Sequence, residues 1–125
     1  MSMYSQIIAS PKGHPTYRSF RLPSLLLSAR GTLLCAFEAR TAVGDLDEMD
    51  LCLTRSTDGG DTFTPYTVLA NAKAFRARYG SEEKESTLNN PVLMQGADST
   101  IHLLFSFDNG LSGLFHTASR DEGES

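Results

Sequence analysis

One polar stretch, residues 56–63, constrains the fold of this chain more than any other. It reads Ser-Thr-Asp-Gly-Gly-Asp-Thr-Phe and lies between two β-prone runs. Asp58 can accept hydrogen bonds from nearby backbone N–H groups, and the two glycines after it can adopt positive φ without a steric clash. The other residues that define the turn are Ser56, Gly60, Thr62 and Phe63. The stretch therefore predicts the tip of a β-hairpin.

A similar turn occurs near the end of the chain, at residues 119–125, which read Ser-Arg-Asp-Glu-Gly-Glu-Ser. Two further landmarks repeat: Pro23 and Pro91 lie 68 residues apart, and so do Thr32 and Thr100. Each of these four residues opens an apolar run. A repeat of this length that contains several short strands predicts the blades of a β-propeller.

The apolar runs predict two units of antiparallel strands. Strands are expected at residues 24–27, 32–40, 50–55 and 64–70 in the first unit, and at 91–94, 100–107 and 111–119 in the second. Residues 33–37 are apolar on both faces, which is typical of a strand that is covered on both sides. The second unit has no fourth strand, and this would leave an unpaired sheet edge. We therefore expect the chain to be part of a longer propeller.

These units divide the chain into four expected segments. They are a lead-in at residues 1–16, a first blade at 17–70, a polar connecting loop at 71–86 and an incomplete second blade at 87–125. The loop carries six charged side chains between residues 76 and 85, so we expect it to be solvated and to contain one helical turn at most.

Composition excludes several classes of protein. With 125 residues, 40% hydrophobic and 21% charged, the chain is typical of one globular domain. Its net charge of −4 and the lack of a basic run argue against a nucleic-acid or membrane-surface partner. No stretch is long and apolar enough for a transmembrane helix, and no signal peptide precedes the first strand, so the chain as given is predicted to be cytoplasmic.

The residues that most often bind metals are not spaced as ligands. Cys35 and Cys52 lie in apolar strand runs, which favours buried free thiols, although neighbouring strands could bring them together as a disulfide. The acidic loop after the second strand lacks the glycine and the terminal glutamate of a calcium loop. The histidines are His14, His102 and His116. We predict no metal and no cofactor.

Taken together, these motifs resemble the sialidase superfamily. Residues 56–63 resemble the Asp box of the bacterial neuraminidase repeat, and Phe20-Arg21-Leu22-Pro23 resembles the Phe/Tyr-Arg-Ile-Pro motif of sialidases, with Leu in place of Ile. Residues 31–40 are similar to the second strand of that family. The match in order and spacing covers residues 17–107. Asp boxes also occur in propellers that are not sialidases.

The resemblance implies an all-β fold: a six-bladed sialidase-type β-propeller, of which this chain would form about two blades of four-stranded antiparallel sheet. The implied activity is that of an exo-α-sialidase, which releases terminal sialic acid from a sialylated glycan with retention, through a tyrosine nucleophile and a glutamate. That pair and two further arginines would lie beyond Ser125, so the chain alone is expected to be inactive. Its apolar sheet faces also favour self-association.

Five residues match positions that carry function in the family. Arg21 would be the first of three arginines that bind the sialic acid carboxylate, since a planar guanidinium binds a carboxylate with two parallel hydrogen bonds. Asp45 would be the general acid/base. Glu38 and Arg40 would reach a hydroxyl on the far side of the sugar ring, and Asn90 would contact the N-acetyl group.

Other interpretations of these residues stay open. Asp47 competes with Asp45 for the acid role, because the run at residues 45–48 departs from the usual loop of the family. Arg40 could instead form a surface ion pair with Glu38 or Asp45, and Asn90 could simply form a turn before Pro91. At the level of the whole protein, the alternatives are a non-catalytic propeller module that binds glycan or protein, and a propeller hydrolase of another sugar.

Overall fold

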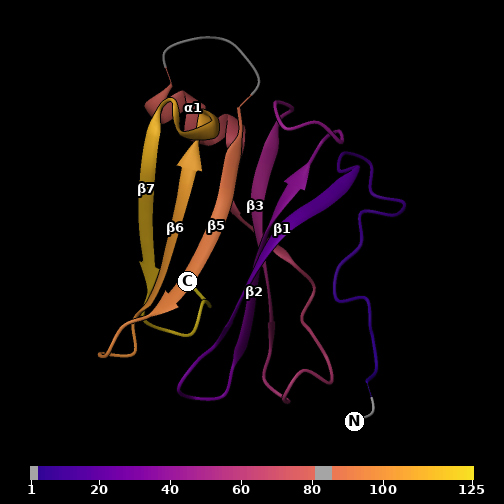
Figure 1. The fold of residues 1–125 in the computed structure, drawn as a ribbon, viewed down its shortest axis with the longest axis vertical. Coiled ribbons are helices and arrows are strands. Elements are labelled where there is room, and N and C mark those ends of the chain that lie inside the picture. The colour runs from indigo at the N-terminus through magenta and orange to yellow at the C-terminus, as the bar shows by residue number, and fades with distance from the viewer. Residues whose placement is uncertain (1–2, 81–85) are drawn as a thin grey trace.

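The computed structural model of the chain describes residues 3–80 and 86–125. The fold is all-β, with two antiparallel sheets packed face to face and one short α-helix at one end of the stack (Figure 1). Within the described residues, no helix has the length and apolar character needed to cross a membrane. The all-β prediction is confirmed.

The first sheet has the strand order β1-β2-β3-β4 and the second has the order β5-β6-β7. Neighbouring strands are antiparallel in both sheets. The strands are β1 (Ser19–Leu27), β2 (Leu33–Arg40), β3 (Met49–Ser56), β4 (Thr67–Ala70), β5 (Leu88–Gln95), β6 (Ile101–Phe107) and β7 (Gly113–Ser119). A 3-10 turn, η1 (Asp108–Gly110), joins β6 to β7.

The two sheets contain equivalent β-bulges at positions that are 68 residues apart. The pairing of β1 with β2 shifts register between Arg21 and Ser24, and the pairing of β5 with β6 shifts between Asn89 and Val92. Within the two bulges, Leu22 and Asn90 adopt φ of 51° and 54°. A proline follows in each case and donates no ladder hydrogen bond, which a bulge tolerates. Because of these bulges, β1 and β5 begin several residues earlier than the apolar runs predict.

The main core lies between the two sheets. The first sheet contributes Leu34, Ala36, Leu51 and Leu53, and the second contributes Leu88, Ile101, Leu103, Phe105 and Phe107. These residues alternate along their strands, so each strand turns one row of side chains toward the partner sheet. Strand β5 is the strand of the second sheet that meets β1: Leu93 N donates to Ser24 Oγ at 2.9 Å.

A second, smaller cluster covers the opposite face of the first sheet. It contains Tyr17, Cys35, Phe37, Ala39 and Cys52, with Ile8 and Ala9 of the N-terminal segment packed against it. Strand β2 is therefore buried on both faces, as its sequence predicts. The two cysteines are buried free thiols, and burial raises the pKa of both.

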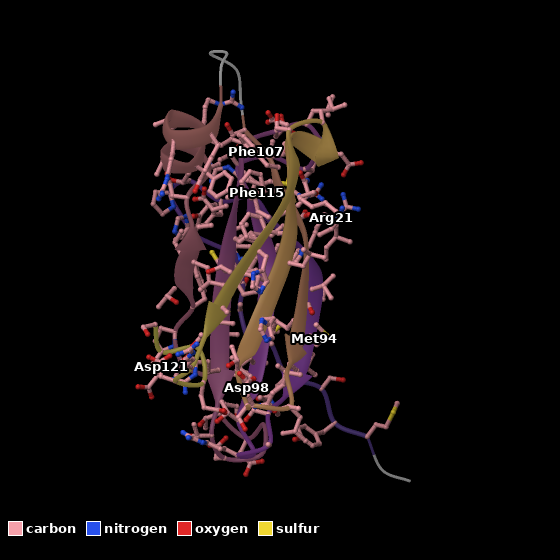
Figure 2. The ribbon with its side chains drawn as sticks, turned by 90° about the vertical axis from the view of Figure 1, so that its left-hand side faces the viewer. Arg21, Met94, Asp98, Phe107, Phe115 and Asp121 are labelled. Atoms are coloured by element: carbon pink, nitrogen blue, oxygen red, sulfur yellow. The ribbon has the colours of Figure 1, made fainter. Side chains whose placement is uncertain are left out.

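The outer face of the second sheet is exposed, unlike the outer face of the first sheet. Its exposed apolar side chains are Val92, Met94, Leu104 and Leu114, and the strand pairing places them on one face. Figure 2 shows Met94 on this side of the molecule. Self-association through such a face stays a prediction.

The segment expected as a solvated loop contains the helix α1 (Ala72–Tyr79). Asn71 caps it, since its side-chain oxygen accepts a hydrogen bond from Ala74 N at 3.0 Å. The ring of Phe75 packs against those of Phe105, Phe107 and Phe115 in edge-on contacts of 4.7–5.6 Å between centroids. One face of the helix therefore belongs to the core. Residues 81–85 of the expected loop lie outside the described residues.

Both aspartate turns, residues 56–63 and 119–125, have the same side-chain hydrogen bonds. In the first, Asp58 accepts bonds from Ser56 Oγ at 2.8 Å, Thr62 N at 2.9 Å and Thr62 Oγ1 at 2.5 Å. In the second, Asp121 accepts bonds from the hydroxyl of Ser119 and from both the backbone N–H and the hydroxyl of Ser125. The expected turn chemistry is thus present in the structure.

A pH-dependent contribution to stability follows from the first turn. Hydrogen bonds from Thr62 and Ser56 hold the pKa of the Asp58 carboxyl down to about 2, below its ordinary 3.8. A pKa that is lowered on folding stabilises the folded state above the ordinary pKa, and this stabilisation is lost as the pH falls toward the folded-state pKa. We expect Asp58→Asn to lower the free energy of unfolding at pH 7, with a difference from the parent that shrinks between about pH 4 and pH 2.

Urea denaturation of the parent and the variant across this pH range measures the effect. Asp61→Asn is the matched control, because Asp61 lies in the same turn, is exposed and loses the same charge. Equal destabilisation by both substitutions would contradict the hydrogen-bond explanation.

Candidate functional site

The five predicted site residues gather at one end of the two-sheet stack. Arg21 lies on β1, Glu38 and Arg40 lie on β2, Asp45 lies in the loop after β2, and Asn90 lies on β5. Figure 2 shows Arg21 toward the end of the molecule that is opposite Asp98 and the second aspartate turn. Because the register pairs Arg21 with Glu38, the two strands bring both arginines to the same loop.

The centre of the site is a buried ion pair between Glu38 and Arg40. The Glu38 side chain has no exposed surface and the Arg40 side chain is 2% exposed. Glu38 Oε2 accepts hydrogen bonds from Arg40 Nε at 2.8 Å and from Nη2 at 2.5 Å. Burial by itself lowers the pKa of Arg40, but its hydrogen bonds to Asp45 and Glu38 outweigh burial and raise it. Arg40 is therefore a fixed cation.

Asp45 lies between the two arginines. Its Oδ1 accepts a hydrogen bond from Arg40 Nη1 at 2.6 Å and another from Arg21 Nη1 at 3.2 Å. Arg40 Nη1 also donates to the backbone carbonyl of Gly44 at 3.0 Å. The Asp45 side chain is 75% exposed and that of Arg21 is 48% exposed, so solvent and ligands can reach both groups. The buried Arg40 therefore fixes the loop at Gly44 and Asp45.

This arrangement determines the charge of Asp45. The hydrogen bond and the charge of Arg40, and then the charge of Arg21, lower the pKa of the Asp45 carboxyl. An opposite charge within hydrogen-bond distance favours the ionised form of a carboxyl group. Without a ligand, Asp45 is therefore an anion, and its carboxylate forms an ion pair with the exposed guanidinium of Arg21.

Asn90 links the second sheet to this cluster through its backbone. Its N–H donates to Glu38 Oε1 at 2.9 Å, so both Glu38 oxygens have partners. The positive φ of Asn90 directs this N–H group, and the Asn90 side chain is exposed. The amide can therefore contact a ligand while the backbone holds Glu38 in place.

Asp47, the rival for the acid role, occupies a different position. Its Oδ2 accepts a hydrogen bond from Gly44 N at 2.9 Å, a local side-chain-to-backbone contact that closes the loop on itself. Asp47 thus shapes the loop, whereas Asp45 faces the two arginines.

Sequence reasoning missed two polar residues, of which one contacts the site and the other lies on the opposite face of the first sheet. The side chain of Asn109, in η1, donates to the backbone carbonyl of Asp45 at 3.3 Å. Asp50 is buried at the start of β3 and accepts hydrogen bonds from Tyr17 Oη at 2.6 Å and Ala72 N at 2.6 Å. The contact between Asn109 and Asp45 joins residues that are 64 positions apart. In the sequence, Asp108-Asn109-Gly110 indicates only a turn, so no local signal predicts this contact.

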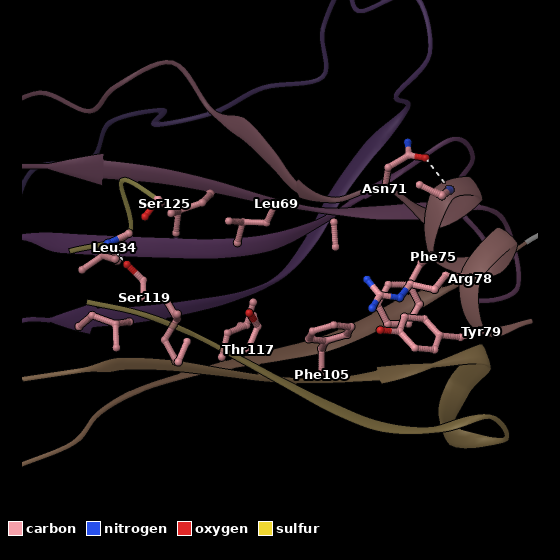
Figure 3. A pocket seen from close by; sticks show the side chains of 18 residues that line it. Leu34, Leu69, Asn71, Phe75, Arg78, Tyr79, Phe105, Thr117, Ser119 and Ser125 are labelled. Atoms are coloured by element: carbon pink, nitrogen blue, oxygen red, sulfur yellow. Dashed lines mark hydrogen bonds between the residues drawn. The ribbon is translucent and has the colours of Figure 1, made fainter. Parts of the chain in front are cut away.

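An apolar cavity and a pair of histidines lie outside the site. A cavity of about 440 Å³ lies between the sheets beside α1, and Leu34, Phe75, Tyr79 and Phe105 are among its largely apolar lining (Figure 3). It contains none of the five site residues. His102 Nδ1 and His116 Nε2 lie 2.9 Å apart on the adjacent strands β6 and β7. No group of three or more metal-ligating side chains occurs in residues 3–80 and 86–125.

Known proteins were compared with the chain at the level of sequence and of structure. No family model matches it, and no curated protein matches it. Several solved structures do. Hadza microbial sialidase Hz136 superimposes with a TM-score of 0.72 over 90% of this chain at 21% identity. The leech intramolecular trans-sialidase gives 0.66 over 85% at 22% identity, and the intramolecular trans-sialidase of Ruminococcus gnavus gives 0.67 over 81% at 22% identity.

These matches establish the fold and also its extent. The chain spans 26%, 18% and 24% of the lengths of those three proteins. At such low identity the similarity concerns the architecture, which in this chain consists of two face-to-face antiparallel sheets. The chain therefore has the sialidase-type β-propeller fold and corresponds to a part of one.

Proposed function

We propose that this chain forms part of the active site of an exo-α-sialidase, a retaining glycoside hydrolase that releases terminal sialic acid from glycoconjugates. The observation that carries this proposal is the convergence of Arg21, Arg40 and Asp45 in one ion-paired cluster. What distinguishes this cluster from an ordinary surface ion pair is the buried Arg40, which holds Asp45 beside the half-exposed Arg21, and this arrangement suits a site for an anionic sugar.

Arg21 is the carboxylate-binding residue in this proposal. Its half-exposed guanidinium contacts one Asp45 oxygen at 3.2 Å, which leaves other N–H donors of the fork for a ligand. A sialic acid carboxylate can bind this fork through two parallel hydrogen bonds. The Asp45 carboxylate occupies part of that site in the free protein, and the substrate takes it over.

Arg40 and Glu38 support the site from below. Both are buried, and Glu38 uses both oxygens on Arg40 and on the Asn90 backbone. We therefore assign Glu38 a positioning role in place of direct contact with a sugar hydroxyl. Arg40 acts mainly on Asp45, because its Nη1 donates to Asp45 and to the carbonyl of the preceding residue.

Asp45 is the general acid/base in this proposal. When the substrate carboxylate binds Arg21, Asp45 loses one cation and gains a nearby negative charge, and both changes raise its pKa. A carboxyl group with a higher pKa can hold a proton and donate it to the leaving oxygen, and it can then accept a proton from water. The exposed side chain of Asn90 contacts the N-acetyl group of the sugar in this proposal. The nucleophilic tyrosine, its glutamate and two further arginines are assigned to the rest of the propeller.

The first prediction concerns Arg21. In the product of the complete reading frame, Arg21→Ala should weaken binding of a 2,3-unsaturated sialic acid analogue by about 10-fold to 150-fold, since a hydrogen bond to a charged group is worth about 1.5–3 kcal/mol. Isothermal titration calorimetry measures the affinity. Arg21→Lys should give an intermediate affinity, because the ammonium keeps the charge but loses the planar fork.

Arg18→Ala is the matched control. Arg18 is exposed and close in sequence, but it donates to backbone carbonyls of residues 14 and 17. Its substitution should leave the affinity unchanged. Equal affinity of the parent and Arg21→Ala would refute the carboxylate-binding role, and the absence of binding by the parent would favour the scaffold or the hydrolase of another sugar.

The second prediction separates Asp45 from Asp47. General acid catalysis contributes about 10²-fold to 10⁴-fold to a rate. For a sialoside with an alcohol leaving group, Asp45→Asn should reduce kcat by an amount in this range. For a nitrophenyl sialoside, whose leaving group needs little protonation, the loss should be much smaller.

Asp47→Asn serves as the comparison in the same assay. It removes the charge but keeps an oxygen that can accept the hydrogen bond from Gly44 N, so it should affect both substrates to a similar, modest extent. If the loss depended on the leaving group in Asp47→Asn and not in Asp45→Asn, the acid role would belong to Asp47.

A further inference from the structure

The turn between β6 and β7 has an unfavourable backbone conformation. Three consecutive residues, Asp108, Asn109 and Gly110, have φ of 52°, 53° and 84°. L-residues other than glycine seldom adopt such values, and asparagine and aspartate do so more readily than the others. Asp108 and Asn109 in this conformation cost free energy, whereas Gly110 adopts it freely, and the turn persists only where the surroundings hold it in place.

The surroundings of this turn do so from several sides. Asp108 N donates to Thr87 O at 2.9 Å, and the Asp108 carboxylate accepts bonds from Arg76 Nη2 at 3.2 Å and Ser112 Oγ at 2.9 Å. The backbone N–H of Asn109 lies 3.1 Å from both Thr87 Oγ1 and Asn89 Oδ1. The turn is therefore fixed to the helix and to the start of β5.

The Asn109 side chain points out of this fixed turn to the loop of the first sheet. Its Nδ2 donates to the backbone carbonyl of Asp45 at 3.3 Å. From the opposite side, Arg40 Nη1 donates to the neighbouring carbonyl of Gly44 at 3.0 Å. Two adjacent peptide groups of the loop are thus held from two directions, one from each sheet.

We propose that Asn109 is a positioning residue that fixes the backbone of Asp45 relative to Arg21, so that the second sheet sets the location of the acid. This inference rests on the proposed function. Asn109 does not reach the reacting atoms itself and acts through Asp45. Polar contacts hold the strained turn, and in this conformation the side-chain amide of Asn109 points at the backbone carbonyl of Asp45.

Asparagine suits this position for two reasons. It tolerates the left-handed backbone, and its amide supplies an N–H donor. Glycine would accept the backbone but has no donor. Aspartate has the same shape and accepts the backbone, but its carboxylate presents only acceptors to a carbonyl oxygen. These two substitutions therefore remove the hydrogen bond without forcing the turn to unfold.

The test uses Asn109→Gly and Asn109→Asp in the product of the complete reading frame. A general acid that is misplaced by about 1 Å can lower a rate by up to about 100-fold. We expect kcat for an alcohol-leaving sialoside to fall by about 10-fold to 100-fold, with KM changed less than about twofold, because Arg21 is untouched. The loss should be smaller for a nitrophenyl sialoside.

Hydrogen–deuterium exchange supplies a readout that does not depend on activity. Amides of residues 43–48 should exchange faster in both variants than in the parent. Leu111→Ala is the matched control, since this side chain is 88% exposed just after the turn. It should alter neither exchange nor kcat, and the melting temperature of Asn109→Gly should not fall.

The outcomes separate this inference from the proposed function. Unchanged exchange in both variants would overturn the anchoring by Asn109. Faster exchange with unchanged kcat would overturn its role in positioning the acid. An inactive parent that binds no sialic acid analogue would refute the proposed function, and the exchange experiment would still decide whether Asn109 holds the loop.

Discussion

The buried pair of Glu38 and Arg40 is the interaction on which the rest of the site depends. Burying two charges costs more than their attraction returns unless every polar atom of the pair is satisfied. Here Glu38 is satisfied by Arg40 and by the backbone N–H of Asn90, and Arg40 is satisfied by Glu38 and the Asp45 loop. The pair therefore joins β2, β5 and the loop in one network. Removing either partner would leave an unpaired buried charge and would disrupt the contacts of the loop and of Asn90, whereas the apolar core between the sheets would remain.

The two ends of the stack solve different physical problems. At one end, the conformation of each aspartate turn is fixed by hydrogen bonds to its own aspartate carboxylate. The second turn also contacts the first sheet, since Glu122 accepts a hydrogen bond from Ser28 Oγ and Glu124 forms an ion pair with Arg55. At the other end, the loops are incomplete alone: the Asp45 loop uses donors from Arg40 and Asn109, and η1 uses Thr87 and Asn89. Strands that end in turns with such local hydrogen bonds form a rigid scaffold. Loops that depend on one another place functional groups from both sheets at a common point.

The sequence predicted the elements whose signal is local or periodic. The repeat of 68 residues anticipated equivalent strands, and Pro23 and Pro91 mark equivalent bulges in the structure. The helix α1 was missed because its segment is mostly polar, although Phe75 and Tyr79 have the spacing of one helical face. The burial of Glu38 could not be predicted from a strand end that looked solvated, because the second sheet covers it. The contact of Asn109 with Asp45 likewise depends on the packing of the two sheets and leaves no local pattern.

The acid role proposed for Asp45 has to be reconciled with its lowered pKa, and the two arginines that share Asp45 offer a physical explanation. In the free protein, Asp45 must be an anion because Arg40 and Arg21 both face it. In the proposed function, a ligand carboxylate on Arg21 would remove one of the two cations that act on Asp45 and add a negative charge, and both changes would raise the pKa of Asp45 while Arg40 stays in contact with it. A ligand without a carboxylate would bring no such change. Under this proposal, the ion pair that keeps Asp45 ionised in the free protein would favour proton donation to an anionic sugar, so recognition of the carboxylate would be part of catalysis as well as of binding.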